Sequence, residues 1–409
     1  MRTLVVIPSY WTGSASTEPK ITTRRSFDRH YRGLCLEKAL TSFKILKEKD
    51  FQILVITATG SPKNQKQIDH EVMGIVRKAR EKTGIPILLF PNTIMPGVQG
   101  IFREHCDQDA LDFLRVDGYS NIRNVGLILA QVMGAEEVVF VDDDEYIDDP
   151  LFLQKAREYL GKSINGRIVA GVGGYYVDPQ KACRRSIKPE PWKTCWDPER
   201  LLNETLCHLV DTQPRIKLTP LVLGGCLVLT RPLFALIPFD VRIPRGEDMD
   251  YLINARMFRF SIFFDNQLHI VHEPPPKRRP LWKRIQQDMR RFMHERAKLD
   301  HQRPVEGMDH VSVEEVMPYP GSFLGKDLEE RFSRACSMLA EQADEEKSAR
   351  EFKDSILLMR TDAAPEYDVF EQYLNLQKKW AKMCNTIAAT RQLREETLAL
   401  LPGFKSNLN

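Results

Sequence analysis

The sequence predicts an α/β protein with a mostly parallel central sheet, a mixed edge and a helical C-terminal region. Three observations support this fold class. Short apolar runs alternate with amphipathic segments over residues 1–150. Glycine-interrupted runs follow from 166 to about 275. Beyond the proline-rich stretch at 272–280 the composition becomes charged and helical, so we place the main boundary there.

Near-continuous apolar runs are typical of strands that are buried on both faces of a parallel sheet. Four such runs occur, and they are TLVVIP (3–8), FQILVIT (51–57), IPILLF (85–90) and EVVFV (137–141). Between them, segments 34–49 and 68–84 carry apolar residues at three- and four-residue spacing and end in Lys or Gly, as helices do. The alternating order predicts parallel strands with helices on both sides.

The strand pattern changes after residue 166, which predicts a mixed or antiparallel edge. The three runs concerned are 167–177, 218–230 and 261–273. A helix is expected over 246–258, because Met249, Leu252, Ile253 and Met257 fall on one helical face. The apolar stripe of 281–293 and the charged segments 326–360 and 366–400 predict further long helices.

Bulk charge and cysteine spacing exclude several classes of protein. Lys and Arg number 59 against 56 Asp and Glu, a net charge of +3 that does not indicate a nucleic-acid partner. The N-terminus lacks the pattern of a secretory signal, and no apolar run is long enough for a transmembrane segment. The eight cysteines are scattered without a CxxC pair, which favours reduced thiols and a cytoplasmic protein.

The stretch EVVFVDDDEYIDD places six carboxylates within eight positions after a buried strand. Like charges at about 5 Å repel by roughly 1 kcal/mol in water and by more in a dry site, so a cation is expected nearby. Ligands bind beyond the carboxyl ends of such strands. In an extended turn Asp142 and Asp144 converge while Asp143 faces elsewhere, and their oxygens suit Mg²⁺ or Mn²⁺ bound to a diphosphate. The alternative is a solvated acidic loop in which Asp148 and Asp149 cap a helix.

The segment NIRNVGLILAQVMGAEEVVFVDDDEYIDDP resembles the GT-A glycosyltransferases, particularly the family 2 type. In that family an RN-G helix leads into a strand and a DXD motif. The resemblance implies that Asp142 and Asp144 are the two DXD carboxylates. The second typically binds the metal, and the first contacts ribose or metal. The implied cofactor is Mn²⁺ or Mg²⁺, and the implied donor is a nucleotide-diphosphate sugar such as a UDP- or GDP-sugar.

Further elements resemble the family in order over residues 3–275. LVVIPSYW resembles its first strand, whose end lies against the base and ribose, and LGGCLVLTRPLFALIPFD resembles the segment that lines the donor sugar and acceptor. The resemblance implies that the substrate-binding residues here are Pro8, Ser9, Tyr10, Arg123, Asn124, Asp142, Gly224 and Gly225. One departure concerns the second strand, which offers only Thr57 and Thr59 where the family often has an acidic residue that reads the base. The base is therefore left open.

RGEDMDYLINARMF resembles the family's ED motif, which implies that Asp248 is the catalytic base, with Glu247 as the close alternative. A carboxylate in this role takes the proton of the acceptor hydroxyl. Acidic residues in the first turn of a helix also stabilise its dipole. We expect one of Glu247, Asp248 and Asp250 to do only that.

His269 and His272 are separated by an odd number of residues, so an extended strand places them on opposite faces. His272 stands at the strand end and is the candidate third metal ligand, in keeping with the late histidine of GT-A enzymes. In the following PPPKRRP, Lys277, Arg278 and Arg279 are candidates for a phosphate clamp. The alternative is that these cations only keep the next helix soluble.

The function that these features indicate is that of a metal-dependent hexosyltransferase acting on a hydroxyl acceptor. The resemblance implies that the transfer inverts the configuration of the anomeric carbon. Residues 1–275 would form the GT-A catalytic domain that binds the nucleotide sugar. Residues 276–409 would pack on the acceptor side or form a homodimer. A small soluble or saccharide acceptor is favoured, and Trp192 and Trp196 either contact it or pack in the core.

Three other functions were weighed against this one. A HAD-like phosphatase also has D-x-D after a strand, but it requires Thr or Val where this chain has Tyr146. A nucleotidyltransferase requires a glycine-rich loop after the first strand, which PSYWTGSAST does not supply. A non-catalytic assembly scaffold would bind neither metal nor nucleotide.

Overall fold

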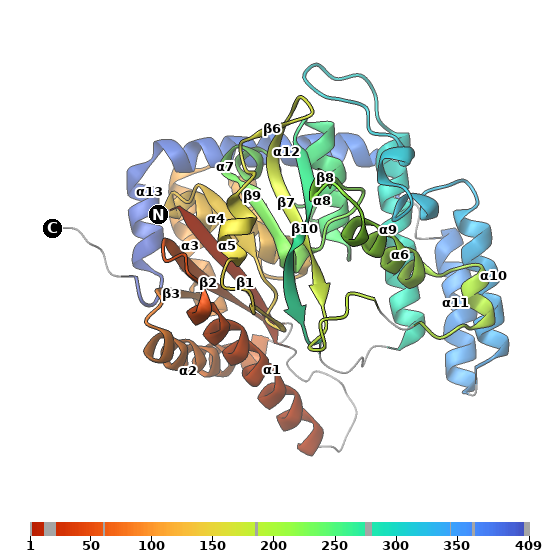
Figure 1. Ribbon diagram of the computed structural model, residues 1–409, viewed down its shortest axis with the longest axis horizontal. Coiled ribbons are helices and arrows are strands. Elements are labelled where there is room, and N and C mark those ends of the chain that lie inside the picture. The colour runs from red at the N-terminus through yellow and green to blue at the C-terminus, as the bar shows by residue number, and fades with distance from the viewer. Residues whose placement is uncertain are drawn as a thin grey trace.

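The computed structural model describes residues 2–11, 22–59, 62–184, 187–274, 280–343, 345–361 and 365–404 (Figure 1). In these ranges one large sheet forms the centre, and eight of its strands follow the order β3-β2-β1-β4-β9-β7-β10-β5. Strands β6 and β8 pair with β7 and β10 at the side. The strands are β1 (Thr3–Trp11), β2 (Phe51–Thr59), β3 (Ile87–Phe90), β4 (Glu137–Phe140), β5 (Glu145–Tyr146), β6 (Ser163–Ile164), β7 (Arg167–Val177), β8 (Ile216–Leu218), β9 (Leu227–Thr230) and β10 (Ser261–His272).

The predicted fold class is confirmed by the strand directions. Strands β3, β2, β1 and β4 run parallel to one another. Strand β9 is antiparallel to both β4 and β7, whereas β7 and β10 are parallel to each other. Strand β5 then pairs antiparallel with β10. The sheet is therefore mostly parallel with a mixed edge, and the carboxyl ends of β1, β4, β7 and β10 share one side.

The helices follow the predicted pattern with several differences in their bounds. They are α1 (Thr22–Ser42), α2 (Gln65–Thr83), α3 (Met95–His105), α4 (Tyr119–Met133), α5 (Phe152–Arg157), α6 (Pro198–Asp211), α7 (Arg231–Leu236), α8 (Glu247–Met257), α9 (Leu281–Asp300), α10 (Leu328–Glu341), α11 (Glu346–Thr361), α12 (Val369–Ala389) and α13 (Arg391–Ala399). The predicted long helix over 326–360 is instead the pair α10 and α11, which pack against each other. The helix predicted over 366–400 is divided at Thr390, whose backbone is extended.

Alternate residues of the parallel strands supply two separate cores, one on each face of the sheet. In β1, Val5 and Ile7 pack with α1, α2 and α5, whereas Leu4 and Val6 pack with α3, α4 and the later helices. This explains the near-continuous apolar runs, because both faces of the strand are buried. Helix α8 lies within the second core and is buried nearly all round, rather than on the single face that its spacing predicted.

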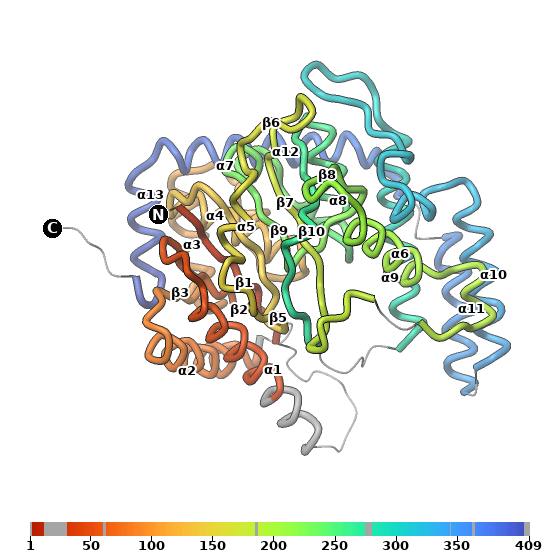
Figure 2. The backbone as a smooth tube through the Cα atoms, in the orientation of Figure 1, coloured from red at the N-terminus to blue at the C-terminus, as the bar shows by residue number. Residues whose placement is uncertain are grey.

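The C-terminal helices complete the second core rather than standing apart from it. Helix α12 packs on α4 and α7, and α13 packs on α3 and α4. Trp380 Nε1 on α12 donates to the carbonyl of Phe234 at 3.0 Å, and Tyr373 Oη donates to that of Pro238 at 3.0 Å. The chain trace shows α12 running along the upper part of the view and α13 at its left edge, while α10 and α11 lie at the far end from β3 (Figure 2).

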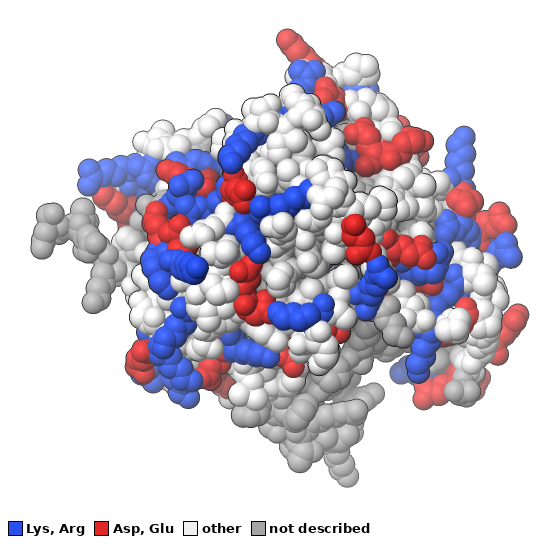
Figure 3. Space-filling model, in the orientation of Figure 1, with Lys and Arg blue, Asp and Glu red and all other residues white. Residues whose placement is uncertain are grey.

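The outer surface carries charges of both signs. On the face seen in Figure 3, lysines and arginines are interspersed with acidic residues over most elements. Among the helices that the structure describes, none has the length and apolar character needed to cross a membrane. The eight cysteines are all free thiols.

Candidate functional site

Several polar side chains meet at the edge where the parallel strands end. Ser9 lies near the end of β1, and the acidic turn follows β4 directly. Tyr176 and His272 lie at the ends of β7 and β10. Because these strands run in the same direction, segments far apart in the sequence bring their last residues to one edge of the sheet.

The three aspartates of the turn each contact a different partner. Asp142 Oδ1 lies 3.1 Å from Arg123 Nη2. Asp143 Oδ2 accepts a hydrogen bond from Ser9 Oγ at 2.7 Å. Asp144 Oδ1 lies 3.6 Å from His272 Nε2. Asp144 and His272 thus face each other, whereas the carboxylate of Asp142 is turned toward Arg123.

Arg123 joins three parts of the site. Its side chain is only 6% exposed. Nε donates to Glu247 Oε1 at 2.9 Å, and Nη1 donates to the carbonyl of Gly224 at 3.0 Å. Burial alone would lower the pKa of Arg123, but Asp142 and Glu247 raise it above its usual value, so the guanidinium stays charged. A Cβ at position 224 would stand 2.4 Å from Nη2, which explains the glycine.

The buried side chain of Glu145 supports the acidic turn by a hydrogen bond to its backbone. Its Oε2 accepts the backbone N–H of Asp142 at 2.9 Å, and Tyr176 Oη accepts that of Gly225 at 2.9 Å. A Cβ at position 225 would stand 2.2 Å from both oxygens of Glu145, so only glycine fits there. The ring of Tyr176 lies 4.8 Å from that of His272. Burial, followed by Asp142, raises the pKa of Glu145 well above its usual value.

Helix α8 brings two further carboxylates to the site. Glu247 binds Arg123, and Asp248 Oδ2 accepts the backbone N–H of Gly224 at 2.9 Å. Burial and the neighbouring Glu247 raise the pKa of Asp248 to about 6. Asp250 was a candidate for a purely helix-capping role, but its side chain binds Lys298 and Asn254 instead.

Negative groups outnumber positive ones at this edge. The acidic side chains are Asp142, Asp143, Asp144, Glu145, Glu247 and Asp248. The buried cations beside them include Arg123 and, near Asp248, Arg291. Burial raises the pKa of Asp142, and burial together with Asp144 raises that of Asp143 to about 7.

Asp144 and His272 are spaced as two ligands of one divalent ion would be. Asp142, the other predicted ligand, does not form a compact three-ligand group with them, and its carboxylate contacts Arg123. Two ligands that each lie about 2.1 Å from an ion are about 3–4 Å apart, which is comparable with the 3.6 Å between Asp144 and His272. A carboxylate and an imidazole together suit Mn²⁺ well, and Mg²⁺ less well.

The remaining predicted residues lie around this edge or away from it. Pro8 and Tyr10 are half-buried near the end of β1. Asn124 is fully buried, and its amide accepts from the N–H of Phe239 at 2.8 Å and donates to the same residue's carbonyl at 2.9 Å. It therefore holds the 239 segment through both its amino group and its carbonyl oxygen. His269 contacts Asp148 at 3.1 Å, away from Asp144.

Two groups of candidates have different outcomes. Lys277, Arg278 and Arg279 lie outside the described residues. Trp196 is 1% exposed and packs edge-on against Phe292, Phe323 and Phe332. Trp192 is also buried. The suggested contact of these tryptophans with an acceptor is therefore replaced by core packing, the more common use of the residue.

Two features of the site were not predicted from the sequence, namely the position of Tyr176 and the supporting role of Glu145. Glu145 stood within the acidic run, but only the fold shows that it turns inward beneath Gly225. Tyr176 is one of two adjacent tyrosines in GGYYV, and its strand pairing decides which one reaches the site. A local signal existed for Glu145, since its side chain follows a buried strand, but none existed for Tyr176.

Comparisons with known proteins give similarity in structure only. No protein-family model matches the chain, and no curated protein matches its sequence. The structure is similar to a mannosyltransferase from Pyrobaculum calidifontis solved with GDP-Man and Mn²⁺, at 14% identity and a TM-score of 0.49, covering 95% of this chain and 86% of that one. It is also similar to glucosyl-3-phosphoglycerate synthase from Mycobacterium tuberculosis solved with Mn²⁺ and UDP-Glc, at 14% identity and a TM-score of 0.35, covering 72% and 78%. A third similar structure is GalNAc-T7 with UDP, GalNAc and Mn²⁺, at 11% identity and a TM-score of 0.38, covering 81% and 56%.

Proposed function

We propose that this chain is a metal-dependent glycosyltransferase that moves a sugar from a nucleotide-diphosphate sugar to a hydroxyl acceptor. The observation that carries the proposal is that two groups of side chains, each containing at least one carboxylate, meet at one edge of the sheet. One group, Asp144 with His272, has the donor atoms of a metal site. The other, Glu247 with Asp248, lies across Arg123 and has the position and chemistry of a general base.

The donor end of the site would be formed by β1 and the acidic turn. Asp144 and His272 would hold Mn²⁺ or Mg²⁺, which supplies positive charge for the departing diphosphate. Ser9 and Tyr10, at the end of β1, would lie against the nucleoside of a UDP- or GDP-sugar. Asp142 would contact the ribose, with its carboxylate oriented by Arg123.

The acceptor end would be formed by Gly224, Gly225 and the start of α8. With its pKa near 6, Asp248 is mostly ionised at neutral pH and accepts the proton of the acceptor hydroxyl. The acceptor oxygen then forms a bond to the anomeric carbon as the bond from that carbon to the diphosphate oxygen breaks. Attack from the face opposite the diphosphate would invert the configuration of that carbon. A small soluble molecule or a saccharide would be the acceptor.

The first test is removal of one metal ligand. Asp144→Asn keeps the shape of the side chain but removes its charge, so Mn²⁺-dependent stabilisation by nucleotide sugars should be lost. Thermal unfolding with a panel of UDP- and GDP-sugars, with and without Mn²⁺, measures this. Release of nucleoside diphosphate in the presence of acceptor measures turnover.

The matched control is Asp148→Asn, which removes a carboxylate from the same acidic segment. In the native protein this carboxylate contacts His269 and not His272. This variant should keep both signals. Normal transfer by Asp144→Asn would overturn the proposal. Release of inorganic phosphate without any nucleotide sugar would instead indicate a phosphatase.

A further inference from the structure

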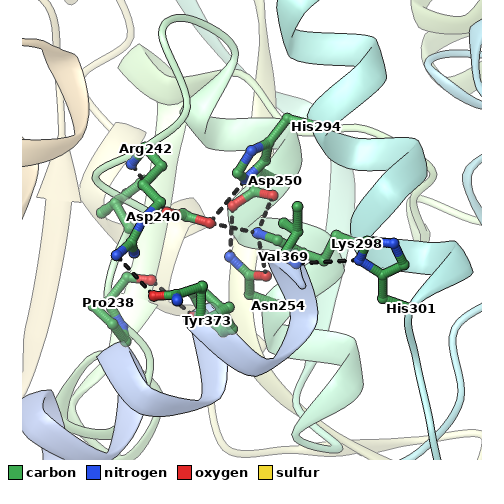
Figure 4. A network of polar contacts seen from close by, with 12 residues as sticks. Pro238, Asp240, Arg242, Asp250, Asn254, His294, Lys298, His301, Val369 and Tyr373 are labelled. Carbon is green, nitrogen blue, oxygen red and sulfur yellow. Dashed lines mark hydrogen bonds and ion pairs between the residues drawn. The ribbon is translucent and has the colours of Figure 1, made fainter. Parts of the chain in front are cut away.

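A second charged cluster is fully buried between α8, α9 and the loop before α8 (Figure 4). Lys298 on α9 has no exposed side-chain area. Its Nζ donates to Asp240 Oδ2 at 2.9 Å, to Asn254 Oδ1 at 3.1 Å and to Asp250 Oδ1. His294 Nε2 lies 3.0 Å from Asp240 Oδ2. The three protons of the ammonium therefore meet three acceptors from two different segments.

This cluster contains the donor set of a metal site, but the chain supplies its own cation. The ligand atoms of Asp240, Asp250 and His294 lie within 4.8 Å of one another. Lys298 bonds to both carboxylates of that set. An ammonium at this position does the work that a bound cation would otherwise do.

The charge state of the cluster follows from its contacts. Burial alone would raise the pKa of Asp240, but Lys298 and His294 hold it well below its usual value. Burial alone would lower the pKa of Lys298, yet Asp240 and Asp250 raise it. A buried pair of this kind costs much when one partner is lost, because the other charge is left without compensation.

The cluster fixes the rotation of the helix that carries the proposed base. Glu247, Asp250 and Asn254 are at positions i, i+3 and i+7 of α8, so they lie along one stripe of the helix. Asp250 is three residues from Glu247, a rise of about 4.5 Å along the axis. Lys298 therefore binds α8 at Asp250, within one helical turn of Glu247 and Asp248.

Helix α9 also supports the beginning of α8 through Arg291. Gly246 precedes α8 with φ of 75°, and a Cβ there would stand 2.2 Å from Arg291 Cδ. The guanidinium of Arg291 donates to Tyr319 Oη and lowers the pKa of Asp248 by its charge. The same α9 thus contacts α8 at its first residues and one turn further on.

We propose that Lys298 is a positioning residue for Glu247 and Asp248, so that a region outside the sheet is needed for the transfer step. This inference rests on the proposed function. Lys298 does not touch substrate and acts through the orientation of α8. A small displacement of a catalytic group lowers the rate while leaving binding of the donor, at the other end of the site, largely unchanged.

The test is the double variant Lys298→Met with Asp250→Asn. It removes one positive and one negative charge together, so the buried net charge is unchanged and Asp240 keeps His294. We expect kcat to fall by about tenfold to a hundredfold while KM for the nucleotide sugar changes much less, because α8 is linked to the donor side only indirectly, through Glu247 and Arg123. Lys298→Arg, which keeps the charge on a longer side chain, should recover part of that loss.

A control variant separates positioning from general stability. Trp380→Phe removes the hydrogen bond from α12 to the carbonyl of Phe234 and changes none of the side chains that bond to Lys298. It should lower the melting temperature but leave kcat unchanged. Asn254→Ala removes one acceptor of Lys298 and gives a second, milder variant of the cluster if the double variant does not fold. It should lower kcat in the same direction.

The outcomes distinguish this inference from the proposed function. Suppose that the native protein transfers sugar, that Asp144→Asn does not, and that the folded cluster variants keep kcat within about twofold. Displacement of the base would lower kcat by more than that, so the positioning role would be wrong while the proposed function stands. If the native protein transfers no sugar, the function itself fails. A fall in kcat for Trp380→Phe equal to that of the cluster variants would also overturn the positioning role.

Discussion

At the scale of single residues, the pKa values of the acidic side chains depend on the few cations that lie near them. Arg123 is shared between Asp142 and Glu247, whereas Asp248 accepts the backbone N–H groups of Gly224 and Met249, each at 2.9 Å. Burial without a direct ion pair explains why the pKa of Asp248 rises while that of Asp240, paired with Lys298, falls. Neighbours, rather than residue type, set the chemistry of each carboxyl group.

The pKa of Asp248 gives a prediction for the pH dependence of transfer. The ionised form accepts the proton, so kcat/KM should be low below about pH 6, rise through that value and level off above it. Asp248→Asn should abolish turnover at every pH while keeping Mn²⁺-dependent donor binding. Steady-state rates from about pH 4.5 to about pH 8.5, roughly 1.5 units below and 2.5 units above pH 6, measure this profile.

Asp148→Asn serves as the control for this experiment, because its carboxylate lies at His269 and away from α8. Its acid limb should match that of the native protein. A profile without any inflection between pH 5 and 7, about one unit on each side of the expected value, would count against Asp248 as the base.

At the scale of elements, α4 carries two adjacent residues with different tasks. Arg123 reaches the carboxylate cluster, whereas Asn124 pairs with both backbone groups of Phe239. Successive residues of a helix point about 100° apart, so neighbours in sequence serve different surroundings.

This difference leads to a prediction about the two variants. Asn124→Leu leaves the N–H and carbonyl of Phe239 unpaired, so the free energy of unfolding should fall by at least about 2 kcal/mol, since each such group costs about 1–3 kcal/mol. Donor affinity should be kept. Arg123→Gln should show the reverse, with donor affinity and turnover lost. Urea unfolding and nucleotide-sugar titration measure the two properties, and a loss of donor affinity in folded Asn124→Leu would contradict this assignment.

The sequence was sufficient for elements whose signal is local. The apolar runs around Val5, Val55 and Val139 predicted parallel strands, because a strand that is buried on both faces has an uninterrupted apolar sequence. The carboxylates at 142–144 were found for a similar reason, since they follow a recognisable strand, whereas Glu247 and Asp248 were assigned from the resemblance of RGEDMDYLINARMF to an ED motif. These features depend only on neighbours in the chain.

Features that depend on distant pairing could not be predicted in this way. Tyr176 reaches the site because of the register of β7 with β10, and Lys298 meets Asp250 because α9 crosses α8. Helix α8 was expected to bury one face, but it is buried nearly all round, and its polar Asp250 and Asn254 face the buried ammonium of Lys298 on α9. The break between α10 and α11 lacked a local signal strong enough to divide the charged run.

At the scale of the whole molecule, the region after residue 280 completes the core of the region before it. Trp380 packs edge-on against Phe113 with ring centroids 5.1 Å apart, and Tyr373 reaches Pro238. Removing this region would expose the apolar faces of α4, α7 and α8 to water. Exposed apolar area of this kind costs about 25 cal/mol per Å².

A fragment of residues 1–274 is therefore predicted not to fold cooperatively. Near-ultraviolet circular dichroism and thermal unfolding of the fragment measure this. The control is the full chain cut by a protease at a site introduced after Glu306, in an exposed turn, where both pieces should stay associated. A cooperative transition of the fragment at the melting temperature of the full chain would contradict the shared core.

The position of Arg123 has one more consequence. A single guanidinium spans the side of the site proposed for the donor and the side proposed for the acceptor, through Asp142 and Glu247. Any group that draws the guanidinium toward one carboxylate weakens its hold on the other, so changes at these two positions will not be additive. The two sides of the proposed site would therefore be thermodynamically linked through this one side chain.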